Sequence, residues 1–508
     1  MLAKVYSAAV HGIEAYPVEV EVNTGRGESN IVIVGLPDTA VKESRDRVMT
    51  ALMNSGFGFP QGRTTINLAP ADVKKEGPSF DLPIAVGMIA ASDQMHHQHL
   101  SDYGLTGELA LNGAVRSVKG ILPIALRARQ DQRHGMLVPA SGAAEAAVVK
   151  GLDVIPIRHL RDAVDFLQDT QSIAPVKVDL TGLLQHRDVE GNDFAEVKGQ
   201  ESVKRALEIA AAGGHNLLMI GPPGTGKSML AKRMPTILPP LTLEEALEIT
   251  RIHSILGLLE PGQALVTQRP YRAPHHKISD AGLLGGNVQP TPGEISLAHH
   301  GVLFLDELPE FKRNVLETLR QPLEEGRVTI SRAAGSITFP SEFMLVAAMN
   351  PTPDGKMPGQ TRCSAREIQN YLGRISGPLL DRIDLHVEVP EVRFREMAAT
   401  APGERSADIR LRVLAARQRQ LKRLSPFPHI SCNARMGPRQ LRAHCNLDTE
   451  TLTILEIAMD TLRLSARAYD RILKVARTIA DMEGAERINV DYLSEAIQYR
   501  SLDRQLWG

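Results

Sequence analysis

Residues 221–228 constrain the fold of this 508-residue chain more than any other stretch. They read Gly-Pro-Pro-Gly-Thr-Gly-Lys-Ser, follow the apolar run 216–220 and precede a segment with helical character. Glycines let a backbone curl so that several N–H groups point at one set of oxygens, beside the positive end of the following helix dipole. A strand, a glycine-rich turn and a helix in this order predict a phosphate-binding loop in an α/β domain.

The residues of this loop have distinct expected roles. We expect nucleotide phosphates to be bound by Gly221, Pro222, Pro223, Gly224, Thr225, Gly226, Lys227 and Ser228. Lys227 is expected to reach the β- and γ-phosphates, and the Ser228 hydroxyl to coordinate Mg²⁺. The loop predicts a nucleotide and Mg²⁺ as ligands, and it does not say what work the nucleotide drives.

Composition sets the broad class of protein. A chain of 508 residues is too long for one compact core, which predicts two or three domains. Hydrophobic residues make up 43% and no stretch is long enough to span a bilayer, so we expect no membrane contact. The N-terminus lacks an export signal and the three cysteines have no paired spacing, which favours the reducing cytoplasm. Because the net charge is −1, nucleic-acid binding would need a local basic surface.

Pattern changes along the chain predict its domain organisation. Residues 1–170 mix strand-like runs with helical stretches, and 171–193 form a polar, unpatterned linker. Residues 194–390 carry the phosphate loop in an α/β core, and 391–508 are helical in period. Within the core, Thr242 and Glu245 form a capping box that predicts a helix start just after Pro239-Pro240.

Three further sites in the core carry polar residues at the ends of apolar runs. The run 301–305 ends in Asp306, expected to hold Mg²⁺ through water, and Glu307, expected to polarise the attacking water. The run 343–349 ends in Asn350, whose amide either holds that water or caps the turn before Pro351. Arg382 precedes another strand-like run, where its guanidinium could reach the phosphate of a neighbouring subunit.

Longer motifs narrow the class of ATPase. They are Pro-His-His at 274–276, Pro-Gly-Glu-Ile-Ser-Leu-Ala-His-His at 292–300, Leu-Pro-Glu-Phe at 308–311 and Leu-Leu-Asp-Arg at 379–382. With them the chain resembles the AAA+ ATPases of the magnesium-chelatase-like branch, and over essentially its whole length the YifB/ComM family. The resemblance implies an ATP-dependent homohexameric ring with active sites at subunit interfaces and a C-terminal helical lid.

The same resemblance implies roles for single residues. It assigns Lys227 and Ser228 to Walker A, Asp306 and Glu307 to Walker B, Asn350 to sensor 1, Arg382 to the finger acting in trans, and Arg467 to sensor 2. The alternative for Arg467 is a solvated helix residue, and Arg463 and Arg471 are neighbours at helical spacing that could be confused with it.

The N-terminal block resembles a protease domain without its catalytic pair. Residues 74–81, Lys-Lys-Glu-Gly-Pro-Ser-Phe-Asp, resemble the segment that carries the nucleophilic serine of Lon-type proteases, at Ser79. The lysine base aligns with Leu122, and Lys119 lies three residues too early. We therefore expect a Lon-like α+β fold of the ribosomal-S5 domain 2 type without protease activity, in which Ser79 is a cap or turn residue.

A zinc site of the family is degenerate in this chain. Many relatives carry Asn-Pro-Cys-Pro-Cys-Gly, whereas residues 350–355 read Asn-Pro-Thr-Pro-Asp-Gly, followed by Cys363. One thiolate cannot hold a structural zinc ion, and Cys432 and Cys445 with nearby histidines lack the usual ligand spacing. We expect no zinc, and no metal besides the Mg²⁺ bound with ATP.

Two basic segments are candidates for contact with nucleic acid. Residues 325–339 read as two short strands around a small-residue turn and resemble the pore hairpins of helicase-like AAA+ rings. Lys277, Arg327 and Arg332 are candidates for DNA phosphate contacts, with surface or interface ion pairs as the alternative. The charges of the arginine-rich helix 406–424 are spread around it, which predicts a solvated face.

Two function classes follow. The first is a DNA motor, a helicase or branch-migration ATPase acting on single-stranded or branched DNA, which the family resemblance links to recombination of incoming DNA in natural transformation and to recombination proteins as partners. The alternative is a chelatase-type subunit that remodels a partner protein. The N-terminal block favours the first, because chelatase motor subunits are expected to lack it.

Overall fold

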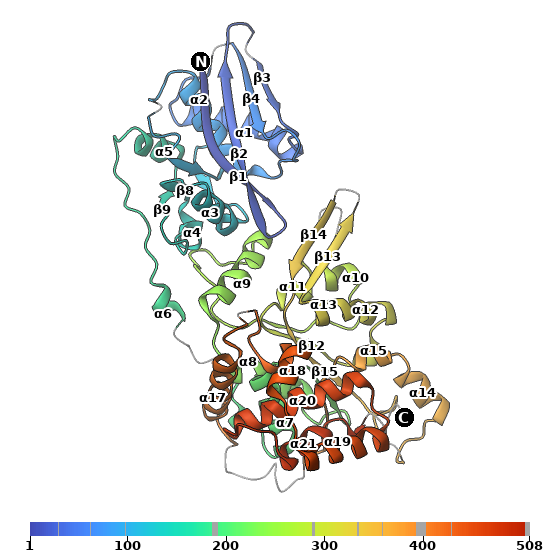
Figure 1. Ribbon diagram of the computed structural model, residues 1–508. Coiled ribbons are helices and arrows are strands. Elements are labelled where there is room, and N and C mark those ends of the chain that lie inside the picture. Colours follow the sequence, from blue (N-terminus) through green and yellow to red (C-terminus); the bar gives the residue numbers. More distant parts are fainter. Residues whose placement is uncertain are drawn as a thin grey trace. The chain divides into compact units, whose positions relative to one another are not determined.

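The computed structural model describes residues 1–508 except 29, 61, 97, 185–191, 287–289, 333–334, 358, 393–402, 428 and 503–508. It divides into two compact units (Figure 1). Unit 1 comprises residues 1–185 and 242–267, and unit 2 comprises residues 186–241 and 268–508. Because the division does not follow chain order, residues 242–267, which the sequence places in the ATPase core, pack with unit 1.

A mixed sheet forms the centre of unit 1. Its strands are β1 (Leu2–His11), β2 (Glu14–Thr24), β3 (Asn30–Val34), β4 (Arg63–Ala69), β5 (Tyr103–Leu105), β8 (Gly135–Pro139) and β9 (Asp153–Ile157), in the order β3-β4-β2-β1-β5-β8-β9. Strands β1, β2 and β4 pair antiparallel, whereas β5, β8 and β9 are parallel. A small ribbon is formed by β6 (Glu108–Leu109) and β7 (Val115–Arg116).

The helices of unit 1 bury their apolar residues against this sheet. They are α1 (Thr39–Asn54), α2 (Asp81–Ala91), α3 (Ile121–Gln130), α4 (Ala143–Ala146) and α5 (Leu160–Leu167). Every residue of α2 is buried, and its apolar side chains join those of β1, β2 and α1 in one core. This agrees with a mixed α/β unit, and the Lon-like identity of its fold stays a prediction.

Helix α9 (Leu243–Leu256) completes unit 1. Thr242 and Glu245 form the predicted capping box, so the helix start predicted from the sequence is confirmed. Leu243 and Leu247 pack against the buried core of α3 and α4. Glu145 of α4 accepts hydrogen bonds from the Leu122 amide and from the Ser254 hydroxyl, which ties α9 to the start of α3.

The predicted linker 171–193 is partly structured. It contains the short helix α6 (Leu180–Leu184), and the Val176 amide donates a hydrogen bond to the Val154 carbonyl of β9. Val176, Val178 and Leu180 pack against the apolar core of unit 1, so the first part of the linker belongs to that unit. Residues 185–191 of the prediction lie outside the described ranges.

Unit 2 is built on a parallel sheet, as the sequence predicts for an α/β core. Its strands are β10 (Leu217–Ile220), β11 (Tyr271–Arg272), β12 (Val302–Leu305), β15 (Met344–Met349) and β16 (Leu385–Glu388), in the order β11-β12-β15-β10-β16. The pairings between these neighbouring strands are parallel, so the carboxyl ends of the strands share one edge of the sheet. Helices α7 (Glu201–Gly213) and α8 (Lys227–Ile237) contribute apolar residues to the same core.

A hairpin and several short helices lie in the chain between β11 and β16. The helices are α10 (Asp280–Leu284), α11 (Glu294–Leu297), α12 (Arg313–Thr318), α13 (Arg320–Glu325), α14 (Ala365–Leu372) and α15 (Gly377–Leu380). Strands β13 (Arg327–Arg332) and β14 (Gly335–Pro340) pair antiparallel as the predicted hairpin, which extends past α12 and α13 (Figure 1).

The C-terminal helices share a core with the sheet. They are α17 (Ser406–Leu424), α18 (Pro438–His444), α19 (Thr449–Leu462), α20 (Ala466–Met482) and α21 (Val490–Gln498). Buried residues of α17 and α20 belong to the same apolar cluster as those of β10 and β15, so the structure groups the predicted lid with the core. Among the described helices, none combines the length and apolar character that crossing a membrane would require.

The arginines of α17 differ in part from the predicted solvated face. Arg417 donates to the Ala211 and Ala212 carbonyls, and Arg423 pairs with Asp481 of α20. These side chains therefore hold α17 against the rest of unit 2. Periodicity could not predict this, because their partners lie about 60 to 200 residues away in the sequence.

Candidate nucleotide-binding site

The candidate site lies at the carboxyl edge of the parallel sheet. The phosphate loop joins β10 to α8, Asp306 follows β12 directly, and Asn350 follows β15 directly. Strand β15 lies between β12 and β10 in the sheet, so these three strand ends are neighbours. Ligands of open parallel sheets bind at this edge.

The loop has the backbone that its glycines permit. Gly224 and Gly226 have φ values of 81° and 86°, in the left-handed region that favours glycine. At Gly221 the constraint is space, because a Cβ atom would lie 2.3 Å from the Val389 carbonyl oxygen. The loop is also anchored by Gln200, the residue that precedes α7: its Nε2 donates to the Thr225 and Pro390 carbonyls at 2.9 and 3.0 Å.

Lys227 joins the loop to the end of β15. Its Nζ donates to the carbonyls of Gly221 and Pro222 at 2.7 and 2.8 Å, and it lies 3.3 Å from Asn350 Oδ1. Burial lowers the pKa of Lys227, while the nearby Asp306 carboxylate opposes that shift. The Asn350 amide thus faces the loop lysine.

Ser228 and Asp306 form the oxygen pair expected for Mg²⁺. Ser228 Oγ donates to Asp306 Oδ2 at 2.6 Å, and the Glu307 amide donates to Asp306 Oδ1 at 2.9 Å. A hydroxyl and a carboxylate at the base of a phosphate loop are the oxygen donors that Mg²⁺ takes together with nucleotide phosphates. The residues therefore fit a magnesium–nucleotide complex.

Glu307 is exposed beside the loop and has a partner that sequence reasoning missed. Its φ is 52°, and His276 Nδ1 lies 3.1 Å from its Oε2. The His276 ring contacts the rings of His275 and Phe311, with centroids 4.1 and 6.4 Å apart. The Pro-His-His motif was visible in the sequence, but only the pairing of β11 with β12 places it beside Glu307.

Arg382 and Arg467 lie in a second cluster. Arg382 is 4% exposed and donates to the Pro378 carbonyl and to Glu324 of α13. Arg467 Nη1 lies 3.9 Å from Oδ2 of Asp381, the residue that precedes Arg382 in the chain. Among the described residues, no hydrogen bond or ion pair joins either arginine to the phosphate loop.

The other arginines near Arg467 have separate contacts. Arg471 Nη1 lies 2.9 Å from Asp384 Oδ1, and Arg463 ends α19 with a φ of 51°. The alternative of a solvated residue at Arg467 agrees with its 58% exposed side chain, which reaches only the Asp381 carboxylate among the described acidic residues.

The candidate DNA contacts lie in the β13–β14 hairpin and in the turn before α10. Arg327 begins the hairpin and its Nε lies 3.2 Å from Glu325 Oε2, which matches the alternative of a surface ion pair. Arg332 pairs with Gly335 at the end of the hairpin, and its side chain lies outside the described part of the structure. Lys277 is exposed in the turn before α10.

In residues 350–363, where relatives are expected to carry zinc ligands, the Asp354 carboxylate accepts several hydrogen bonds. Asp354 Oδ1 accepts hydrogen bonds from the Thr352 and Thr361 hydroxyls at 2.8 and 2.7 Å, and its Oδ2 accepts one from the Arg362 amide. The threonine hydroxyls hold the pKa of Asp354 well below its usual range. Cys363 is a free thiol, and the absence of zinc stays a prediction.

The position of the protease dyad holds no titratable pair. Ser79 lies in the 3-10 turn Pro78–Phe80, where its carbonyl accepts a hydrogen bond from the Gly107 amide. Leu122 is fully buried in the first turn of α3, whereas Lys119 is exposed. A leucine cannot take a proton from serine.

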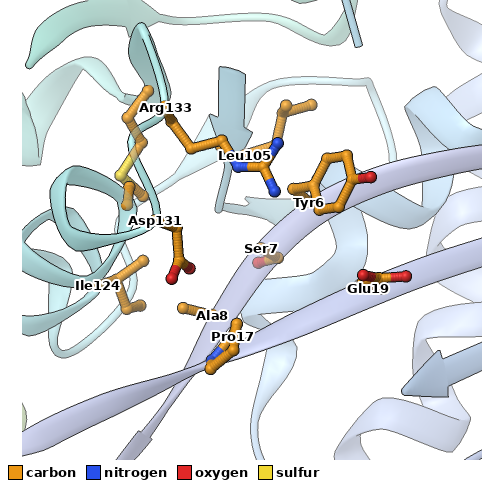
Figure 2. Close-up of a pocket in the computed structure, with 12 residues that line it drawn as sticks. Tyr6, Ser7, Ala8, Pro17, Glu19, Leu105, Ile124, Asp131 and Arg133 are labelled. Atoms are coloured by element: carbon orange, nitrogen blue, oxygen red, sulfur yellow. The ribbon is translucent and has the colours of Figure 1, made fainter. Parts of the chain in front are cut away.

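Unit 1 contains a cavity of about 300 Å³. Figure 2 shows Ser7 and Asp131 facing it, with the Arg133 guanidinium over the Tyr6 ring at 3.6 Å from the centroid. Its charged groups already have partners in unit 1: Asp131 pairs with Arg127 at 2.7 Å, and Arg133 donates to the Ser101 carbonyl. The cavity lacks the loop and acid pair that identify the site in unit 2.

Three family models match the chain. They are "Magnesium chelatase, subunit ChlI" over residues 193–397, "Subunit ChlI of Mg-chelatase" over 20–142 and "Magnesium chelatase, subunit ChlI C-terminal" over 403–500. The second match lies in the N-terminal block that we expected chelatase subunits to lack. That block by itself therefore no longer favours the DNA motor over the chelatase-type alternative.

Curated relatives are similar over very different lengths. The uncharacterized protein YifB of Escherichia coli strain K12 is 46% identical, and the competence protein ComM of Haemophilus influenzae is 45% identical; each alignment covers 99% of this chain and 98% of the relative. The magnesium-chelatase 38 kDa subunit of Rhodobacter capsulatus is 23% identical over 59% of this chain. The chain belongs to the YifB/ComM family of magnesium-chelatase-like AAA+ proteins.

Proposed function

We propose that this protein is a Mg²⁺-dependent ATPase whose active sites form between the subunits of a homohexameric ring. The observation that carries the proposal is the convergence of Lys227, Ser228, Asp306, Glu307 and Asn350 at one edge of the sheet. A loop lysine, a hydroxyl–carboxylate pair and an exposed second carboxylate are the parts that phosphoryl transfer to water requires.

Each residue has a chemical task in this proposal. Lys227 and the loop amides bind the phosphate oxygens, while Ser228 and Asp306 hold the magnesium ion, which neutralises developing charge when bound. Glu307 accepts the proton of the attacking water, and the Asn350 amide orients that water. His276 holds Glu307 when the two form their ion pair.

Arg382 is proposed to complete the site of the neighbouring subunit, and Arg467 to act as sensor 2 from the helical lid. The contacts of Arg382 support its part, because its guanidinium bonds to Pro378 and Glu324 and to no described residue of the subunit's own loop. A guanidinium delivered to the γ-phosphate stabilises transition-state charge.

Arg382→Ala is expected to bind ATP normally and to lose hydrolysis by about 1000-fold, the contribution of an arginine finger. Mixing it with Glu307→Gln protein should restore activity, because Glu307→Gln subunits donate an intact Arg382. The measurement is phosphate release from each protein and from the mixture. Arg366→Ala, on the exposed surface of α14, is the control. A mixture as inactive as its components would contradict action in trans.

The work of this ATPase is proposed to be movement along single-stranded or branched DNA in the cytoplasm, during recombination of incoming DNA. The support is full-length similarity to the competence protein ComM, together with a two-stranded hairpin bearing Arg327 and Arg332. Recombination proteins are the proposed partners. The N-terminal unit is proposed to be Lon-like without protease activity, since Leu122 stands at the base position.

Forked or single-stranded DNA is expected to raise the ATPase rate about tenfold, and added salt should weaken the effect because lysine and arginine contacts displace counterions. Arg332→Ala should reduce the stimulation, measured as phosphate release against DNA concentration, whereas Arg366→Ala should not. Branch migration of three- and four-strand junctions tests the motor directly. No stimulation by any DNA and no shift of labelled DNA would favour the chelatase-type alternative.

A further inference from the structure

The segment 381–384, which carries Arg382, is held by several elements of unit 2. Asp381 accepts a hydrogen bond from Ser465 Oγ at 3.2 Å, and the Ile383 carbonyl accepts one from Arg500. Asp384, at 1% exposure, lies against Arg471 and His215. The segment therefore has one defined position relative to α20 and to the turn before β10.

Asn216 connects this segment to the sheet. Its Nδ2 donates to the carbonyl of Arg382 at 3.0 Å, while its Oδ1 accepts from the Leu345 amide at 2.9 Å. Its own amide donates to Asp384 Oδ2 at 3.0 Å, and its carbonyl accepts from the amides of Asp384 and Leu385. The half-buried side chain of Asn216 thus bridges the backbone of Arg382 and the backbone of Leu345 near the start of β15.

The position of Asn216 in the chain gives this bridge its significance. Residue 217 begins β10, which runs directly into the phosphate loop, and β15 runs from Leu345 towards Asn350. The Asn216 side chain therefore joins three backbones: the strand before the subunit's own loop, the strand before Asn350, and the segment that presents Arg382.

The charged surroundings of Asp384 reinforce the same junction. Although burial raises the pKa of Asp384, the neighbouring Arg471, His215 and Lys474 hold that pKa below its usual value. His215 also lies 2.8 Å, through Nε2, from the Thr478 hydroxyl of α20. The junction is thus a charged, hydrogen-bonded contact between α20 and the start of β10.

We propose that Asn216 is a positioning residue that fixes Arg382 for its action on the neighbouring subunit by tying the Arg382 backbone to β10 and β15. The inference rests on the proposed role of Arg382 in trans. It predicts that a subunit without the bond from Asn216 Nδ2 to the Arg382 carbonyl positions its Arg382 poorly in the site of its neighbour. The subunit's own nucleotide-binding loop is expected to stay intact.

Asn216→Asp isolates this bond. The aspartate keeps an oxygen that accepts from the Leu345 amide, but it cannot donate to the Arg382 carbonyl. We expect unchanged affinity for a fluorescent ATP analogue and about tenfold lower ATP turnover in the full-length protein. Mixing with Glu307→Gln protein should restore turnover, because those subunits donate a correctly held Arg382 to the intact sites of the variant.

The controls separate the possible outcomes. Asn370→Asp, exposed on α14, makes the same chemical change away from the junction. Asn216→Ala, which adds no charge, serves as a second variant if the melting temperature of Asn216→Asp shows that it does not fold. The mixture of Arg382→Ala with Glu307→Gln is the reference for action in trans.

Three results would overturn either the role of Arg382 in trans or the positioning role of Asn216. No restoration in the reference mixture overturns the role of Arg382 in trans. Restoration in the reference mixture but not with the Asn216 variants overturns the positioning role alone. Weakened nucleotide binding in both Asn216 variants would show that Asn216 supports the subunit's own loop, and this result also overturns the positioning role.

Discussion

Glu307→Gln is expected to bind ATP and to hydrolyse it about 100- to 10,000-fold more slowly, the usual contribution of a general base. Glutamine keeps the size and polarity of the side chain but offers an amide in place of the basic carboxylate. Binding should persist because, among the described residues, the Glu307 side chain pairs with His276 and makes no hydrogen bond to the phosphate loop. Single-turnover phosphate release and equilibrium binding of a labelled nucleotide measure the two properties separately.

The matched control for this change is Glu450→Gln. Glu450 is exposed in the first turn of α19, so the same substitution there should alter neither property. If Glu307→Gln turned over ATP at the unsubstituted rate, Glu307 would not be the base, and another carboxylate near the loop would have to be sought.

Lys227→Ala is expected to weaken ATP binding about 30-fold or more and to abolish turnover at moderate ATP concentrations. Removing one member of a buried, hydrogen-bonded charge pair costs about 2–5 kcal/mol, and 1.4 kcal/mol corresponds to a factor of about ten in the dissociation constant. The pair here would be the Lys227 ammonium with the phosphate oxygens. Isothermal titration with a slowly hydrolysed ATP analogue and Mg²⁺ measures the loss.

Lys232→Ala is the control for Lys227→Ala. Lys232 lies on the same helix, α8, but its side chain is exposed, so its removal should leave affinity unchanged. Lys227 also holds the loop together through the Gly221 and Pro222 carbonyls, and a melting curve of each variant therefore accompanies the titration. Equal affinities of the two variants would remove Lys227 from the phosphate site.

Local sequence predicted the parts of the site whose chemistry is carried by adjacent residues. The loop 221–228, the acid pair at 306–307 and the amide at 350 each follow an apolar run that the structure confirms as a strand. A capping box is equally local, and the helix start at Thr242 is confirmed. These predictions succeed because hydrogen bonds between residues a few positions apart depend little on the rest of the chain.

The sequence did not predict the partners that these residues take across the fold. In each of these contacts the two partners are about 25 to 60 residues apart in the chain. The contacts are His276 with Glu307, Gln200 with Thr225, and Glu324 with Arg382. Nothing in the local pattern distinguishes such residues from surface ones. The placement of 242–267 in unit 1 was missed for the same reason, because apolar residues of α9 find their partners on α3 and α4.

By itself, the sequence determined the glycine-rich loop that we propose binds phosphate, the strands that precede Asp306 and Asn350, and membership of the YifB/ComM family. The tertiary structure alone decided that Arg382 and Arg467 lie together beside Asp381, away from the loop, and that Asn216 bonds to the Arg382 carbonyl. The physical reason is the range of the interactions. Glycine conformation, capping and strand patterning act over a few residues, whereas strand order and buried ion pairs depend on how distant segments pack.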